Sequence, residues 1–181
     1  MAEVRLNAVL GRSARRFPVR RVGYLLKPDV AAFPTFSSDR RGHWLRAAAA
    51  EPSLGIRPWV EGERYPNSSV PALLAAQAAR RQGDALSETF HFTLFHTFLV
   101  DNRDISEPAV LETVAQRSGL DLDRFRVDLK DPTLREAVYA EHLDSIDRWG
   151  TEAVPTIVVG EARIEGAAPP AVYQAAVARL A

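Results

Sequence analysis

Residues 153–167 read AVPTIVVGEARIEGA, and this stretch decides the fold. Residues 156–159 form a short and mostly apolar run, and Gly160 follows where a turn is needed. A second short run then ends at Gly166. We therefore predict a β-hairpin, which a loop introduces through the Val154–Pro155 dipeptide.

The composition indicates a globular protein. The chain has 181 residues, of which 46% are hydrophobic, so it can bury a sizeable core in one domain or in one domain with an insert. Its 23 basic and 23 acidic residues balance, which argues against nucleic acid as a partner of the whole protein. An arginine-rich segment over residues 12–21 is the local exception, and we interpret it as a solvated helix face.

Several classes of protein are disfavoured by what the sequence lacks. No apolar run approaches the ~20 residues of a membrane span, so no membrane partner is predicted. No secretion signal is recognisable at the start, and we expect a cytoplasmic protein. The chain contains no cysteine, which excludes disulfide bonds, thiolate metal sites and dithiol chemistry by these residues alone.

The segments before residue 69 predict few regular elements. Helical spacing of apolar residues predicts an amphipathic helix over 6–17 that Pro18 stops, although residues 4–10 also alternate as a strand does. A strand is predicted over 19–26. The remaining predictions are a loop, a short helix and an extended stretch with three prolines, at residues 31–38, 40–50 and 51–67.

From residue 69 the pattern becomes helical. Serines act as N-caps, and Gly83 and Gly119 end two of the helices. The predicted caps are Ser68 or Ser69, Ser87 and Ser106. The predicted helical segments are 69–83, 87–100, 106–119, 122–129, 132–149 and, after the hairpin, 170–180. The order is therefore helix, strand, a block of helices, strand, strand, helix.

Four segments carry a family resemblance. They are GYLLKPD at 23–29, YPNS at 65–68, LFHTFLVDNRDIS at 94–106, and residues 153–170. From about residue 22 to its end, the chain resembles the DsbA family of thioredoxin-fold proteins, and more specifically its FrnE-like branch. Relatives of this branch include 2-hydroxychromene-2-carboxylate isomerases and kappa-class glutathione transferases.

The resemblance implies an α/β, thioredoxin-like fold with an inserted helical domain. Residues 1–69 and 150–181 would form the thioredoxin-like domain, and residues 70–149 the helical insertion. It also implies an ancestral role in thiol–disulfide exchange or in thiol-dependent isomerisation.

The chain departs from the family at its front. In the relatives, a first strand leads into a Cys-x-x-Cys turn, and here that turn would fall at or before residues 1–4, which contain neither cysteine nor serine. The first strand is thus expected to be missing or improvised, and unpaired strand edges cost ~1–3 kcal/mol for each buried group. Residues 3–8 could form a makeshift strand, a second chain could donate one, or the gene product could be longer.

The candidate site follows from the same resemblance. The Val154–Pro155 bond is expected to be cis, so that the Val154 backbone and the neighbouring Thr156 bind an extended peptide or a thiol-bearing small molecule. Asn67 would hold a polar group of the ligand, although a turn residue at a helix start explains it as well. No catalytic residue is predicted. No metal site is predicted either, because His91 and His96 lie five residues apart, where one ion is poorly reached.

Three functions remain open. The leading one is a DsbA/FrnE-like thiol-disulfide oxidoreductase family protein that is redox-inactive as given and keeps a binding cleft beside the proline. The second is an isomerase or transferase that uses an external thiol such as glutathione or mycothiol, although no cofactor is required. The third is an interaction protein that pairs through an exposed strand edge, with a partner or as a homodimer. Whether the chain is an enzyme stays open.

Overall fold

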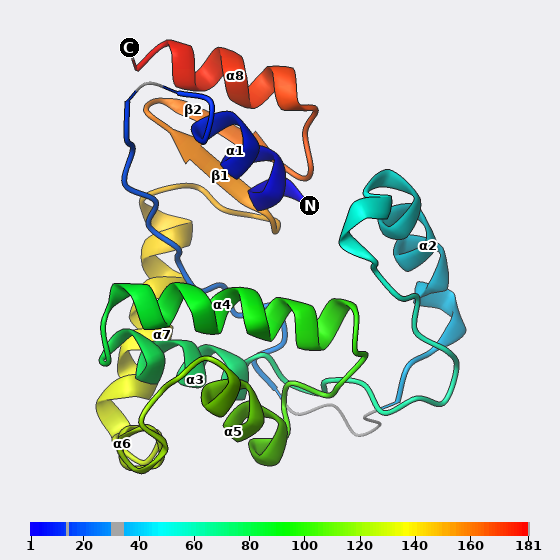
Figure 1. Cartoon of the computed structure of the whole chain (residues 1–181), viewed down its shortest axis with the longest axis vertical. Helices are drawn as coiled ribbons and strands as arrows, with labels where there is room; N and C mark the ends of the chain where they lie inside the picture. Colours follow the sequence, from blue (N-terminus) through cyan, green and yellow to red (C-terminus); the bar gives the residue numbers. More distant parts are fainter. Residues whose placement is uncertain (14, 30–34, 181) are drawn as a thin grey trace. The chain divides into compact units, whose positions relative to one another are not determined.

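The structure is a computed structural model that describes residues 1–13, 15–29 and 35–180 (Figure 1). It divides into two compact units, which are described separately. One unit combines Met1–Tyr24 with Glu141–Ala181, and the other is Leu25–Ala140. The predicted domain boundaries, 1–69 with 150–181 and 70–149, stay a prediction.

The unit that combines the two ends of the chain contains the predicted hairpin (Figure 1). Strands β1 (Thr156–Val159) and β2 (Ala162–Glu165) pair antiparallel, with Ile157 opposite Ile164. Gly160 starts the turn between them and has a φ of 60°, a backbone angle that residues with a side chain rarely adopt. A Cβ at this position would also lie 2.9 Å from the Leu180 side chain, which would have to move to admit another residue.

Two helices pack on the hairpin. They are α1 (Ala2–Leu10) and α8 (Pro170–Ala178). Their buried residues form one core with the strands. Because side chains alternate along a strand, only one face of the hairpin joins this core. The buried members are Ala2, Leu6, Val9, Ile164, Tyr173, Ala176 and Val177.

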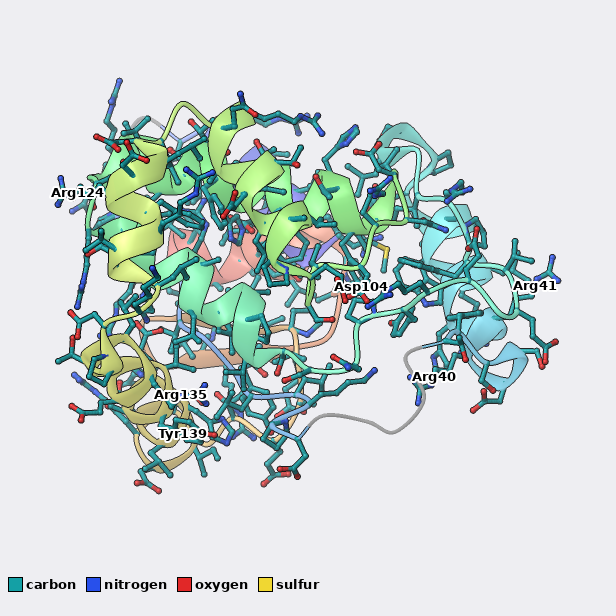
Figure 2. The ribbon with its side chains drawn as sticks, turned by 90° about the horizontal axis from the view of Figure 1, so that it is seen from below. Arg40, Arg41, Asp104, Arg124, Arg135 and Tyr139 are labelled. Carbon is teal, nitrogen blue, oxygen red and sulfur yellow. The ribbon has the colours of Figure 1, made fainter. Side chains whose placement is uncertain are left out.

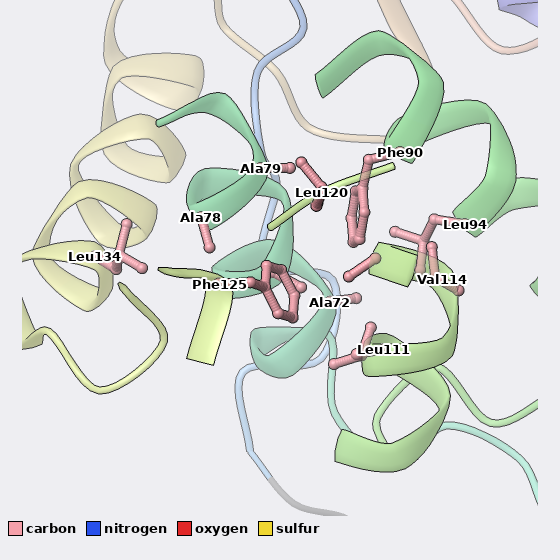
Figure 3. Packing of buried hydrophobic residues seen from close by; sticks show 12 residues of the cluster. Ala72, Ala78, Ala79, Phe90, Leu94, Leu111, Val114, Leu120, Phe125 and Leu134 are labelled. Atoms are coloured by element: carbon pink, nitrogen blue, oxygen red, sulfur yellow. The ribbon is translucent and has the colours of Figure 1, made fainter. Parts of the chain in front are cut away.

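The unit Leu25–Ala140 is mostly helical. Its helices are α2 (Arg41–Ala50), α3 (Val70–Arg80), α4 (Asp84–Leu99), α5 (Pro108–Arg117), α6 (Leu122–Asp128) and the first part of α7 (Pro132–Asp147). Helices α3 to α7 bury one apolar cluster, in which Phe90 and Phe125 are fully enclosed (Figure 3). Short 3-10 helices, Ser38–Arg40 and Pro52–Leu54, flank α2.

The sequence signals explain where these helices begin. Prolines occupy the first turn of α3, α5 and α8, where a missing N–H costs nothing. Asp121 caps α6 by accepting a hydrogen bond from the Arg124 amide at 3.0 Å. Asp131 caps α7 in the same way, through the Thr133 amide at 2.9 Å.

The strand predicted over residues 19–26 is wrong, and the makeshift strand, one of three alternatives for the start of the chain, does not form. Residues 19–26 pair with no strand in the described part of the chain, and the Gly23 amide donates instead to the Glu141 side chain at 2.9 Å. Residues 3–8 form no makeshift strand, because they lie inside α1. The predicted loop over 31–38 falls partly outside the described residues.

Two helix boundaries also differ from prediction. The first helix ends at Leu10 rather than at residue 17, because Gly11 disfavours continuation and tighter turns follow it. Ser87 is not an N-cap. Helix α4 begins three residues earlier, at Asp84, after Gly83 has reversed the chain with a φ of 110°.

Candidate binding site on the hairpin

The candidate site lies where the loop enters β1. The Val154–Pro155 peptide bond is cis, and the Val154 side chain is 43% exposed. The Pro155 carbonyl accepts a hydrogen bond from the Gly166 amide at 2.8 Å. The Thr156 hydroxyl donates to the Ala153 carbonyl at 2.6 Å. The loop is therefore held on both sides of the proline.

The hydrogen-bonding register decides which backbone groups face outward. In an antiparallel pair, opposed residues alternate between exchanging hydrogen bonds and pointing away. The bond between Gly166 and Pro155 places Ile157 in the bonded set, opposite Ile164. Thr156 and Val158 therefore direct their N–H and C=O groups away from β2.

This outer edge of β1 is open in the described part of the chain. The sheet there has two strands, and no hydrogen bond from another described element reaches the Thr156 or Val158 backbone. The Val158 side chain is 37% exposed. The edge thus offers two donors and two acceptors beside partly exposed apolar side chains.

The loop after β2 is anchored to α1 and α8. The Arg5 guanidinium of α1 donates to the carbonyls of Ala167 and Ala168 at 2.7 and 2.9 Å. The Tyr173 hydroxyl of α8 donates to the Gly166 carbonyl at 3.4 Å. Since Gly166 in turn bonds to Pro155, these contacts fix the geometry of the candidate site.

Asn67, the fourth predicted site residue, belongs to the other unit. It is half-buried, and its side chain makes no hydrogen bond within the described ranges. The residues around it are tied together. The Lys27 amide donates to the Ser69 hydroxyl at 3.1 Å, and the Lys27 ammonium donates to the Pro66 carbonyl at 3.0 Å.

A cluster of cations and aromatic rings lies next to Asn67 in the sequence, at Tyr65. The Lys27 ammonium is 4.7 Å from the centre of the Tyr65 ring, and the Arg40 guanidinium is 5.9 Å from it. Burial lowers the pKa of Lys27, and the Arg40 charge lowers it further, whereas Asp104 acts in the opposite direction. Figure 2 shows Arg40 before α2 and Asp104 before α5.

Sequence reasoning missed this cluster. The three residues Lys27, Arg40 and Tyr65 lie far apart in the chain, and no local spacing indicates that they meet. Burial also raises the pKa of Tyr65. The one available signal is that Tyr65 directly precedes Pro66 and Asn67.

Neither histidine of α4 lies in a metal-binding group. His91 contacts the Phe95 ring, with 4.8 Å between ring centres, and His96 lies 3.5 Å from the Asp101 carboxylate. Over residues 1–13, 15–29 and 35–180, no cluster of three His, Cys, Asp or Glu residues could hold a metal ion. No described helix has the length and apolar character needed to cross a bilayer.

The comparison with protein families gives the class. Residues 44–170 match the family described as Thioredoxin, and these residues make up more than half of the chain. The chain therefore belongs to the thioredoxin family.

Comparison with solved structures identifies the fold. The probable DsbA oxidoreductase of Streptomyces coelicolor is 18% identical in sequence to this chain. The two structures match with a TM-score of 0.78, and the match covers 98% of this chain and 82% of that one. The cytosolic disulfide reductase DsbM of Pseudomonas aeruginosa, solved with GSH, is 19% identical, with a TM-score of 0.68 over 99% and 91%. The predicted thioredoxin-like α/β fold with a helical insertion is thereby confirmed. Assignment to the FrnE-like branch stays a prediction.

Two curated proteins resemble about half of the chain. The ClpXP adapter protein SpxH of Shouchella clausii is 31% identical over 87 residues, which are 48% of this chain and 29% of SpxH. The Na(+)/H(+) antiporter NhaA 3 of Salinispora tropica is 34% identical over 91 residues, which are 50% of this chain and 14% of the antiporter. The chain thus matches less than a third of either relative.

The absence of cysteine limits the chemistry of this fold. Exchange of disulfides requires a thiolate as nucleophile, and the 181 residues supply none. The chain is therefore a thioredoxin-family protein whose 181 residues contain no dithiol.

Proposed function

We propose that the chain is a redox-inactive binding protein that holds an extended peptide along the outer edge of β1. The observation that carries this proposal is the outward direction of the Thr156 and Val158 backbone groups on an anchored hairpin. Strand addition uses such groups for affinity and the flanking side chains for specificity. Val154, Pro155 and Thr156 form the start of this edge.

The similarity to SpxH supports binding without chemistry. That protein is named an adapter, and an adapter acts by holding its partners. A cytoplasmic location fits the same proposal, because DsbM is described as cytosolic. A second copy of this chain is one alternative occupant of the edge, which would make a homodimer.

The test compares the two edges of the hairpin. A fluorescein-labelled ten-residue peptide of alternating threonine and valine is titrated into the full chain, and binding is followed by fluorescence polarisation. Val158→Pro removes an outward N–H and no ladder bond, and it should weaken binding at least tenfold. The matched variant Glu165→Pro removes an outward N–H from β2 and should bind as the parent does.

Three results would contradict the proposal. They are the lack of any peptide binding, equal binding by the Val158→Pro variant, and a dimer in sedimentation experiments that Val158→Pro dissociates. The last result would assign the edge to a second copy of the chain.

A second candidate function is an isomerase or transferase that uses an external thiol. The observation that favours it is that the structural neighbour DsbM was solved with GSH. The unpartnered Asn67 amide would then hold a polar group of the thiol compound. Glutathione should raise the melting temperature of the parent and not of an Asn67→Ala variant. No shift on addition of glutathione would remove this candidate.

A further inference from the structure

A groove lies between β2 and α8, apart from the edge discussed above. Its volume is about 420 Å³. One wall is the strand and the other is the helix. The residues that matter are Arg163 and Ile164 on β2, and Ala171, Val172, Ala175 and Arg179 on α8.

The strand wall is the second open edge of the hairpin. Because Ile164 is in the bonded set, Arg163 and Glu165 direct their N–H and C=O groups away from β1. Within the described ranges, no third strand pairs with β2. A strand laid in the groove would therefore find main-chain donors and acceptors along one side.

The helix wall is apolar and shallow. Val172 is 42% exposed, although valine usually lies in a core. Ala171 and Ala175 are exposed as well, and their short side chains leave room between the helix and the strand. An apolar side chain of a bound peptide would be buried here together with the Val172 side chain.

One end of the groove carries a cation that has no partner among the described residues. Arg179 follows the last turn of α8, and no described residue forms a hydrogen bond or ion pair with its guanidinium. Arg163 differs, because it donates to the Gly150 carbonyl at 2.5 Å and pairs with Glu165 at 3.0 Å. An acidic group of a guest would thus be attracted to the Arg179 end.

We propose that this groove binds an extended peptide segment that carries an apolar side chain and an acidic residue. The segment adds as a strand to β2, places its apolar side chain against Val172 and Ala175, and directs its carboxylate toward Arg179. The proposal is independent of the function assigned to the β1 edge, because it uses other backbone groups and another helix face.

The probe is a labelled peptide with the sequence EVTVTVE, which has an acid at both ends and so suits either strand direction. The control peptide is KVTVTVK. Both are titrated into the full chain by fluorescence polarisation. The acidic peptide should bind about five- to tenfold more tightly, as expected for a charge pair at a rim. The Arg179→Glu variant should abolish or reverse this preference.

Variants of α8 then locate the peptide. Ala175→Trp fills the groove and should abolish the preference for EVTVTVE over KVTVTVK, whereas Gln174→Trp adds the same ring at a neighbouring exposed position outside the lining and should leave that preference unchanged. Glu165→Pro should abolish this preference as well, while Val158→Pro should leave it unchanged, because the preference arises in the groove and not at the β1 edge. Circular dichroism confirms that each variant is folded.

The proposal is overturned if Ala175→Trp leaves the preference for the acidic peptide unchanged, or if the two peptides bind equally well. Loss of the preference in Val158→Pro alone would place the acidic peptide on β1 and also overturn it. A concentration-dependent dimer that Ala175→Trp dissociates would assign the groove to a second copy.

Discussion

Individual side chains of the helical unit differ sharply in what they contribute to stability. Phe90 and Phe92 lie two positions apart on α4, but Phe90 is 0% exposed and Phe92 is 40% exposed. Phe90 packs on Phe125, with 6.0 Å between the ring centres. The side of the helix on which a phenylalanine lies therefore decides how much that residue contributes to stability.

We expect Phe90→Ala to lower the free energy of unfolding by ~3–5 kcal/mol, because it leaves a cavity in a closed core. Phe92→Ala should change it by less than about 0.5 kcal/mol, as surface substitutions do. Urea unfolding followed by circular dichroism measures both. Equal losses in the two variants would contradict the burial described above.

Asp131 links stability to pH. The Thr133 amide, the Arg81 guanidinium and the Thr133 hydroxyl donate to its carboxylate and lower its pKa to about 2. In the unfolded chain the pKa is ~3.9, so the unfolded state takes up the proton first as the pH falls. The stabilisation by Asp131 is therefore complete above about pH 4 and is lost as the pH falls toward 2.

We expect Asp131→Asn to flatten the pH dependence of stability between about pH 4 and 2. Urea unfolding of the parent and the variant at several pH values measures the effect. Asp123→Asn is the control, because among the described residues Asp123 pairs only with Arg126, at 3.4 Å. An unchanged slope in Asp131→Asn would show that another group titrates.

At the scale of elements, the hairpin register makes a sharp prediction. Ile157 donates its N–H to the ladder, whereas the Val158 N–H points outward. Ile157→Pro should cost about 3 kcal/mol, from an unpaired acceptor and lost burial together. Val158→Pro should cost about 1 kcal/mol or less. Thermal unfolding of both variants measures these losses of stability. A larger loss in Val158→Pro than in Ile157→Pro would mean that the register is shifted by one residue.

Elements with local signals could be predicted from the sequence. Prolines in first turns and glycines after last turns placed α3, α5 and α8, and the alternation around Gly160 placed the hairpin. The predicted strand over 19–26 failed because a strand also needs a partner, which composition does not reveal. Helices α1 and α4 were found, but with shifted ends, because Gly11 and Gly83 decided the boundaries.

The long helix α7 shows the same limit for burial. Its apolar residues predict a broad buried stripe, and the structure encloses Leu134 and Val138. Tyr139, one turn after Arg135 in Figure 2, is 40% exposed, and Leu143 is 56% exposed. The pattern identifies an apolar face. How much of that face becomes buried depends on packing partners far away in the sequence.

At the scale of the whole molecule, the candidate site could be predicted only in part. Residues 154–156 were identified from the family pattern, and their backbone directions follow from the register of β1 and β2. Neither the groove beside α8 nor the contacts of Lys27 with Tyr65 has a sequence signal, because each arises where separate segments meet.

The lack of cysteine also makes a prediction for the whole chain. Reduction of insulin by dithiothreitol should proceed at the same rate with and without the protein, since it offers no thiolate. Turbidity of the insulin solution measures the rate, and thioredoxin serves as the positive control. An acceleration that rises with protein concentration would contradict a redox-inactive function.

Amide hydrogen exchange of β1 tests the central claim most directly, read residue by residue with NMR. In the absence of peptide, the Ile157 and Val159 amides should be protected, whereas the Thr156 and Val158 amides should exchange rapidly. A saturating amount of the threonine–valine peptide should protect Thr156 and Val158 as well. The account is contradicted if these two amides are already protected without peptide, or if they remain unprotected when the peptide is bound.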